Sequence, residues 1–432
     1  MTQPVAPPPV VVDGRRVVPP DVERIDAALR FDLDTREAVA KATVHFTAGG
    51  QDGHPALDLR QPVEWLRLDG TSLDPSALPS RDLGAEPGAE MRVLDVSLEA
   101  GSPHRLEIGY RLEKPTAAGA EDIGWQDEGV RFDLWMSDLR PGRYLEMWVP
   151  APLVHDRFAL SLAVELLGKG RPHTLIANTG GVDAARGGKK WSLRYPAHFT
   201  SLSPMLILAP SDQIEVRRSA VVIPDRERSL GVVCARSTDI DVDLEACAAD
   251  LRAWLVYLSS RYGPWTHGDT FWALLWAPER GMEYDGATTS SVKALEHEVF
   301  HSWFGRGVKP ARAADGWIDE AWTTWATSTR SSDRLGRFET VELGLDEPPV
   351  ELYPPSAWSR HTPLAAYTEG ARLFAGLAAL LGGPERLRAA MADWYRVNLG
   401  GFVTTNGLAA HLAAWSGIDI GPWWARYVHG RG

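Results

Sequence analysis

The sequence predicts an α+β protein in which an antiparallel β domain is followed by a domain of strand and helices. Between residues 21 and 212, short segments alternate apolar and polar residues with period two and are separated by turn residues. From residue 243 onwards, apolar residues recur with the helical period instead. A chain of 432 residues also exceeds one ordinary domain. We therefore expect a β-sandwich or saddle over residues 21–212 and a second domain over residues 213–432.

The N-terminal segment MTQPVAPPPVVVDGRR is rich in proline, and we expect a mobile tail over residues 1–20. It lacks the basic start and long apolar core of a secretory signal. The strand candidates that follow share the alternating pattern and are ALRFDLD, AKATVHFTA, WLRLDG, RVLDVSLEA, HRLEIGYRL, FALSLAVEL and WSLRYPA. The intervening DG, GS, EKP and GKGRP are typical of turns between antiparallel strands.

The second domain is expected to begin with a helix over residues 243–261. DTFWALLWAP then has the composition of a buried strand. Almost every later segment has helical periodicity, so we expect this domain to be mostly helical. The later runs are WIDEAWTTWAT, TEGARLFAGLAALLG, ERLRAAMADWYRVN and GLAAHLAAWSG.

A helix of about fourteen residues is expected around HEVFH, because N-cap candidates precede it and Gly305 can end it. The N-cap candidates are Thr289, Ser290 and Ser291. The apolar stripe of this helix consists of Val292, Leu295, Val299 and Trp303. His297 and His301 fall on the opposite side, where a cleft is expected.

HEVFH and a later glutamate supply a complete set of zinc ligands and a base. Residues i and i+4 lie on one helix face, so His297 and His301 can hold one ion. Glu320 follows His301 after eighteen residues, in the first turns of a helix expected from Trp317. Catalytic zinc commonly takes three His or Glu ligands and leaves one position for water. We expect one Zn²⁺ bound by His297, His301 and Glu320, with Glu298 as general base.

Composition excludes several other classes of protein. With 45 basic and 57 acidic residues the formal net charge is −12, which argues against a nucleic-acid partner. No apolar run approaches the length of a membrane span, so no membrane partner is expected either. Two cysteines, Cys234 and Cys247, imply no disulfide framework. A cytoplasmic location is the expectation.

HEVFH, the eighteen-residue gap and GWIDEAW resemble the aminopeptidase N family of zinc peptidases, of the gluzincin type. GMEYDG at 281–286 is similar to the family's Gly-x-Met-Glu-Asn exopeptidase motif. AAYTEGA at 365–371 is similar to its Tyr-x-Lys-Gly-Ala motif. The resemblance covers most of residues 270–425, and upstream the β strands followed by MWVPAPLVHDRF are similar to the family's N-terminal saddle domain. It implies a thermolysin-like catalytic domain after the N-terminal saddle.

The resemblance also implies roles for individual residues. Tyr367 would stabilise the oxygen of the scissile carbonyl, with Tyr284 as its rival because it lies nearer to HEVFH in the sequence. Glu283 would bind the α-ammonium of the substrate. Asp138 is the candidate for a residue that the N-terminal domain usually contributes to amine binding. The implied substrate-binding set consists of Gly281, Met282, Glu283, Tyr284 and Asp138.

The sequence departs from the family pattern at several positions. The asparagine of the exopeptidase motif is Tyr284, the motif lysine is Glu369, and the asparagine before the third ligand is Asp319. Thr327 replaces an acid that often supports a zinc histidine. Thirteen residues separate Glu283 from His297, fewer than is usual, and the chain ends at residue 432 without the helical C-terminal domain of the larger members. A more open cleft is therefore expected.

The predicted function is a zinc aminopeptidase acting on peptides with a free N-terminus. A zinc endopeptidase or an epoxide-type hydrolase on the same metal site stays open, because the exopeptidase motif is altered. A scaffold with a retired site is the third alternative. Retired sites normally lose a ligand or the base, and this chain keeps all four.

Overall fold

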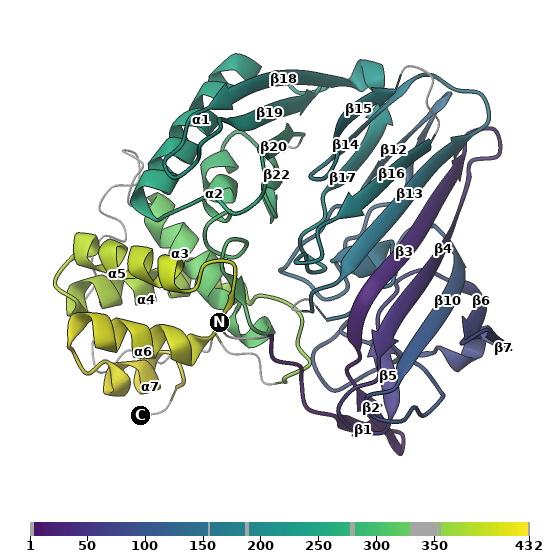
Figure 1. Ribbon diagram of the computed structural model, residues 1–432, viewed down its shortest axis with the longest axis horizontal. Coiled ribbons are helices and arrows are strands. Elements are labelled where there is room, and N and C mark those ends of the chain that lie inside the picture. The colour runs from purple at the N-terminus through teal and green to yellow at the C-terminus, as the bar shows by residue number, and fades with distance from the viewer. Residues whose placement is uncertain are drawn as a thin grey trace. The chain divides into compact units, whose positions relative to one another are not determined.

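The computed structural model describes residues 4–153, 156–185, 190–276, 281–328, 352 and 356–430. These residues form two compact units (Figure 1). The β unit comprises Ala6–Glu215 and the separate segment Ser356–Arg360. The mixed unit comprises the described parts of Met1–Val5, Val216–Pro355 and His361–Gly432. The β unit thus ends three residues beyond the expected 212, and it includes a segment from far along the chain, which local sequence patterns do not predict.

Three sheets make up the β unit. The largest has the order β16 (Lys190–Tyr195), β13 (Ala159–Leu167), β3 (Asp21–Asp32), β4 (Glu37–Thr47), β10 (Pro103–Arg111), β6 (Val63–Leu68) and β7 (Thr71–Leu73). The second has the order β1 (Val10–Val12), β2 (Arg15–Val18), β5 (His54–Leu57), β9 (Met91–Val93) and β8 (Ser80–Arg81). The third has the order β11 (Gly124–Gln126), β12 (Gly129–Asp133), β17 (Leu206–Pro210), β14 (His173–Ala177) and β15 (Gly181–Ala185).

Period-two alternation explains the large sheet. Buried and more exposed residues alternate along β4 and β13, so one face of each strand packs on the core and the other meets solvent. Pairing is mostly antiparallel, as predicted, but β3 pairs with β13 in parallel, as does β2 with β5. Alternation does not encode strand direction, which is why the sequence missed these two pairs.

The structure differs from the predicted tail over residues 10–18. These residues form β1 and β2, which pair antiparallel, and Val17 and Val18 are buried. The turn between them is Asp13-Gly14, and both residues have positive φ, at 50° and 73°. An Asp-Gly turn of this kind matches the twist of a β-hairpin. The Asp-Gly pair therefore predicts a hairpin here, whereas the prolines alone predict a mobile tail.

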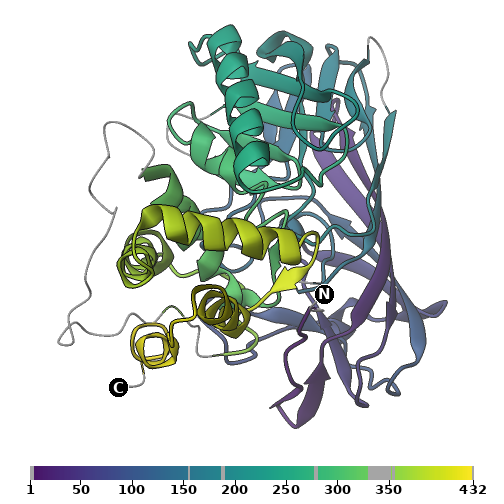
Figure 2. The ribbon, with the colours of Figure 1, turned by 60° about the vertical axis from the view of Figure 1, so that its left-hand side comes forward.

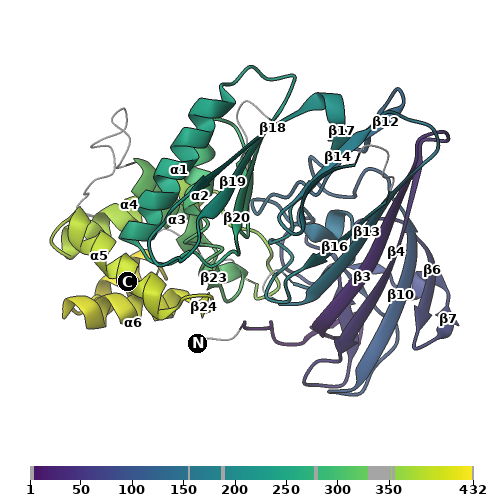
Figure 3. The ribbon, with the colours of Figure 1, turned by 45° about the horizontal axis from the view of Figure 1, so that its top comes forward.

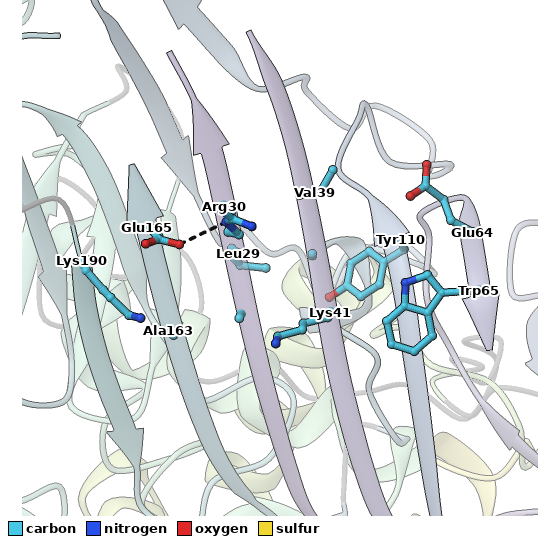
Figure 4. A pocket seen from close by; sticks show the side chains of 12 residues that line it. Leu29, Arg30, Val39, Lys41, Glu64, Trp65, Tyr110, Ala163, Glu165 and Lys190 are labelled. Carbon is cyan, nitrogen blue, oxygen red and sulfur yellow. Dashed lines mark ion pairs between the residues drawn. The ribbon is translucent and has the colours of Figure 1, made fainter. Parts of the chain in front are cut away.

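The solvent-facing side of the large sheet has a shallow groove of about 430 Å³ (Figure 4). Trp65 lies across Gly109 of the neighbouring strand, since a Cβ added at Gly109 would come within 1.9 Å of the indole nitrogen. Arg30 and Glu165 form an ion pair of 3.1 Å on its far side. Gly109 is therefore required by the close approach of the indole, not by its backbone angles.

The mixed unit contains a five-stranded sheet and all seven α-helices that the described residues form. The sheet has the order β18 (Ile214–Val221), β19 (Leu230–Ser237), β20 (Thr270–Leu275), β22 (Ala287–Ser290) and β21 (Gly281–Tyr284). The helices are α1 (Leu244–Arg261), α2 (Leu295–Phe300), α3 (Trp317–Ser328), α4 (Ala365–Leu380), α5 (Pro384–Val397), α6 (Thr405–Ser416) and α7 (Gly421–Tyr427). A small second sheet pairs β23 (Lys309–Pro310) with β24 (Phe402–Val403). The expectation of a mostly helical domain thus underestimated its β-sheet.

The elements of the mixed unit share one apolar core. Helices α1 and α2 lie against the sheet (Figure 3), while α3 packs on α4, α4 on α5 and α5 on α6 (Figure 2). Four tryptophans near the expected ligands are completely buried in this core: Trp303, Trp317, Trp322 and Trp325. The predicted elements at 243–261, at DTFWALLWAP and at Trp317 are confirmed by α1, β20 and α3.

Helix α2 is much shorter than the fourteen residues expected. Thr289 and Ser290 belong to strand β22, and the α-helix starts only at Leu295. Val292 is 47% exposed, so it lies outside the apolar stripe that includes the buried Leu295, Val299 and Trp303. Thr289 and Ser290 were misassigned because Ser and Thr also suit a buried strand. Ser291 lies outside the strand, and its Oγ accepts a hydrogen bond of 3.1 Å from the amide of Ala294, in the turn before the helix. Among the described residues, no helix has the length and apolar character that crossing a membrane requires.

Candidate metal centre

Three ligand candidates from two helices converge in the mixed unit. Nitrogen or oxygen atoms of His297, His301 and Glu320 all lie within 4.8 Å of one another. Oε2 of Glu320 is 3.1 Å from Nε2 of His297 and 3.5 Å from Nε2 of His301. The one turn between the histidines brings their ring centroids to 4.6 Å. Helix α3 supplies Glu320 from its first turn, where the helix dipole also stabilises a carboxylate.

Asp319 orients the second histidine. Its Oδ1 is 2.5 Å from Nδ1 of His301, which leaves Nε2 of His301 buried and without a hydrogen bond. Metal-binding histidines commonly donate their other ring N–H to a carboxylate in this way. The sequence identified Asp319 only as a departure, although it stands next to Glu320. Thr327, which stands where the family often has a supporting acid, donates to the carbonyl of Thr323 on its own helix. The carboxylate that contacts His301 is that of Asp319.

These buried groups shift one another's pKa values. Burial opposes the charged form of His301, yet Asp319, Glu283 and Glu320 raise its pKa well above the ordinary value. Burial also opposes the charged form of Glu320, but His301 and His297 lower its pKa far below the usual range. Burial raises the pKa of Asp319 to about 6 against the influence of His301. The two histidines are thus the positive partners that keep the buried Glu320 ionised.

Glu298 lies beside the ligand atoms and touches the neighbouring strand. A Cβ added at Gly281 would come within 2.0 Å of Oε1 of Glu298, so only glycine leaves space for this carboxylate. Strand β21 is the last strand of its sheet in the described residues, and its outer edge can pair with an extended peptide. The predicted base and the predicted substrate-binding strand are thus in contact.

Tyr367 reaches the centre from the first turn of α4. Its hydroxyl donates a hydrogen bond of 2.7 Å to Oε1 of Glu320, and its ring stacks with His297 at a centroid distance of 6.1 Å. Tyr284 is buried on β21, where its hydroxyl is 3.5 Å from Oγ1 of Thr289. Alternation along β21 turns Tyr284 and Met282 away from the face that Gly281 and Glu283 share. The geometry favours Tyr367 over its rival.

Glu283 is buried and already has a cationic partner. Its Oε1 is 2.6 Å from Nη2 of Arg306, and both side chains are almost completely buried. A carboxylate oxygen of Glu283 also lies within 4.8 Å of Glu298 and His301. Arg306 is buried, although arginine is ordinarily exposed. No local pattern marks an arginine that closes a buried ion pair with a strand 23 residues earlier.

Two other predicted residues have hydrogen-bond or ion-pair partners within their own units. Asp138 belongs to the β unit, where its backbone carbonyl accepts a hydrogen bond of 3.2 Å from Tyr144. Its role in amine binding stays a prediction. Glu369 pairs with Arg372 at 3.2 Å on the partly exposed side of α4.

The residues present fit a zinc ion. Two imidazoles and one carboxylate form the donor set that zinc prefers, and the buried Nε2 of His301 has no other hydrogen-bond partner. A second set of Glu283, Glu298 and His301 is equally compact. It suits a metal less, because the guanidinium of Arg306 already neutralises Glu283.

The order of a β unit and a sheet-and-helix unit, with HEVFH and a third ligand candidate on the next helix, agrees with the resemblance to gluzincin-type metallopeptidases. Comparison with solved structures narrows this class. An M1 zinc metallopeptidase mutant from Deinococcus radiodurans is 19% identical at a TM-score of 0.63, over 96% of this chain and 95% of that chain. Legionella pneumophila aminopeptidase A, in complex with aspartic acid, is 12% identical at a TM-score of 0.68, over 95% of this chain and 49% of that chain.

Yeast LTA4 hydrolase in complex with bestatin is 14% identical at a TM-score of 0.60, over 96% of this chain and 68% of that chain. No family model matches the sequence, and no curated protein matches it. The chain therefore has the fold of the M1 zinc metallopeptidases.

Proposed function

We propose that the protein is a zinc-dependent aminopeptidase that hydrolyses the N-terminal peptide bond of peptides. The observation that carries this proposal is the convergence of His297, His301 and Glu320 with Glu298 and Tyr367 around them. Structures of the same fold support it, since one M1 metallopeptidase was solved with a Tyr-Ser-Ala substrate and another with L-arginine.

Each side chain has a defined task in this reaction. Bound zinc supplies Lewis-acid activation of a water molecule and of the substrate carbonyl. Glu298 accepts a proton from the attacking water and transfers it to the leaving amine. Tyr367 donates a hydrogen bond to the carbonyl oxygen as that oxygen becomes negative. Glu283, on the edge strand, accepts hydrogen bonds from the α-ammonium of the substrate.

The charges around the centre favour a substrate with a free amine. Four carboxylates lie together here, those of Glu283, Glu298, Asp319 and Glu320, and Arg306 contributes one positive charge. Three negative charges remain, and a divalent ion neutralises two of them. An α-ammonium would neutralise the last one in a buried setting where an uncompensated charge is costly.

An endopeptidase is the second candidate, and one observation favours it. Arg306 already occupies Oε1 of Glu283, which reduces the negative charge available to a substrate amine. An endopeptidase would bind an internal stretch of peptide along β21 without needing that charge.

The deciding experiment compares aminoacyl chromogenic amides with a free and an acetylated amine. We expect cleavage of the free-amine substrates only. Glu283→Ala should raise KM for these substrates and reduce the difference in kcat/KM between free-amine and acetylated amides. Glu298→Gln is the control for the chemistry: it should keep its zinc and lose at least ~10²-fold in kcat. Equal cleavage of free and acetylated amides would establish the endopeptidase, and no cleavage of either would leave the scaffold.

A further inference from the structure

The turn after α2 places the buried guanidinium of Arg306 between β21, which carries Glu283, and α3, which carries Glu320. Backbone hydrogen bonds hold this turn, because the amide of Arg306 donates to the carbonyl of His301 at 3.0 Å. The amide of Gly305 donates to Val308 at 2.9 Å. Gly305 has φ of +101°, a conformation that favours glycine, so the backbone turns sharply just before the arginine.

On one side the guanidinium fixes Glu283. Nη2 of Arg306 is 2.6 Å from Oε1 of Glu283, and both Nε and Nη2 lie 3.4 Å from the backbone carbonyl of the same residue. The side chain and the backbone of Glu283 are therefore held by one planar group. Arginine suits this geometry because its donors point in fixed directions, whereas the ammonium of lysine is a single point charge.

On the other side the guanidinium faces Asp319. Nη1 of Arg306 is 3.9 Å from Oδ2 of Asp319, while Oδ1 of Asp319 is 2.5 Å from Nδ1 of His301. A Cβ added at Gly305 would come within 1.8 Å of Oδ2, so the backbone closes over this carboxylate. Asp319 thus contacts the histidine through Oδ1 and faces the guanidinium through Oδ2, while Nη1 of Arg306 itself donates to the carbonyl of Gly305 at 3.0 Å.

We propose that Arg306 is a positioning residue that joins the amine-binding carboxylate to the metal ligand through the ion-pair chain Glu283–Arg306–Asp319–His301. Arg306 orients Glu283 for the substrate and Asp319 for the histidine, so a single substitution there affects both substrate and metal binding. The substrate half of this inference rests on the proposed aminopeptidase function. The metal half does not.

The metal half is tested without substrate, by measuring zinc affinity through competition with a chelator. Asp319→Asn should weaken zinc binding about 10- to 100-fold, because it removes the charge that orients His301. Arg306→Gln should weaken it in the same direction. The double variant should match Asp319→Asn within about twofold, because coupled residues are not additive. Additive losses of zinc affinity in the double variant, or wild-type zinc affinity in Arg306→Gln, would overturn the proposed ion-pair chain.

The substrate half is tested by steady-state kinetics at saturating zinc. Arg306→Gln should raise KM for free-amine substrates, as Glu283→Ala does, whereas Asp319→Asn should leave this KM unchanged. Lys309→Gln is the matched control, since Lys309 is also buried and its Nζ is 2.5 Å from Asp285 and 3.3 Å from the backbone carbonyl of Arg306, so it perturbs the same turn and leaves the guanidinium in place. It should lower the melting temperature without changing zinc affinity or KM.

Two further outcomes separate the inference from the proposed function. If wild type cleaves no peptide while the zinc affinities follow the predicted pattern, the function fails and the metal half stands. If wild type cleaves peptides while Arg306→Gln behaves like Lys309→Gln, the inference fails and the function stands. Should Arg306→Gln not fold, Arg306→Lys keeps the charge, and it should show the same two defects because an ammonium cannot contact both carboxylates in this geometry.

Discussion

Tyr367 is the residue that we expect to act in the chemical step and not in substrate binding. Its hydroxyl is held 2.7 Å from Oε1 of Glu320, and the proposed function assigns to it the carbonyl oxygen of the substrate, which becomes negative in the transition state. Tyr367→Phe should lower kcat by about 10²-fold with little change in KM, because the hydrogen bond is needed mainly in the transition state. Steady-state kinetics with zinc analysis checks this. Tyr284→Phe is the matched control and should retain activity, and the reverse result would assign the role to Tyr284.

Asp156 makes stability depend on pH. Burial raises its pKa to about 7, against a lowering influence from the amide of Val22, which donates to Oδ2 at 2.9 Å. The unfolded value is about 3.9. Between these values the folded state binds more protons, so this residue's contribution to stability falls as pH rises from about 4 to about 7 and is constant above.

Asp156→Asn removes this titration and keeps an oxygen that can accept the bond from Val22. We expect the variant to gain melting temperature relative to wild type, with a larger gain at pH 8 than at pH 5. Thermal unfolding in matched buffers measures this difference. Asp82→Asn, on an exposed turn, is the control and should show the same small effect at both pH values. A gain that is equal at the two pH values would contradict the assignment.

Among the elements, the segment Ser356–Arg360, which we call the strap, belongs to the β unit although it lies far from the rest of that unit in the sequence. Trp358 packs in a cluster with Val17 and Val93, and its indole donates to the carbonyl of Pro8 at 3.0 Å. The buried guanidinium of Arg360 lies 2.9 Å from Asp58 and 3.4 Å from Glu146. Burial raises the pKa of Glu146, and Arg360 is the main group that lowers it again.

Arg360→Met should destabilise the protein by about 3–5 kcal/mol, because removing one partner of a buried ion pair leaves an uncompensated charge. Urea unfolding followed by tryptophan fluorescence measures the loss. Trp358→Phe, which keeps most of the packing and removes one hydrogen bond, should cost about 1 kcal/mol and serves as the comparison. A loss of less than 1 kcal/mol for Arg360→Met would show that the pair is replaceable.

These elements show what the sequence could and could not predict. Helix α1, strand β20 and the start of α3 follow local periodicity and capping, which single segments encode. The short α2 was missed because whether Thr289 belongs to a strand or a cap depends on a neighbouring strand. The strap was missed because Arg360 and Asp58 are 302 residues apart, and the role of Arg306 depends on a similar non-local contact.

At the scale of the whole molecule, every residue that we assign to the metal lies in the mixed unit, on helix α2, at its C-cap or on helix α3. Zinc that binds only the folded state stabilises it by about 4.1 kcal/mol when its free concentration is 1,000 times Kd. The ion also relieves repulsion among four buried carboxylates, so its effect should concentrate where they lie.

We therefore expect one equivalent of zinc to raise the melting temperature and to slow hydrogen exchange in α2, α3 and β21, with no change in β3, β4 and β10 of the β unit. Hydrogen exchange with mass spectrometry, with and without a chelator, measures both regions in one experiment. Glu320→Gln is the control, because it keeps the volume of the side chain and removes the charged ligand, and zinc should not protect it. Equal protection of both units, or protection that persists in Glu320→Gln, would place the ion elsewhere in the protein.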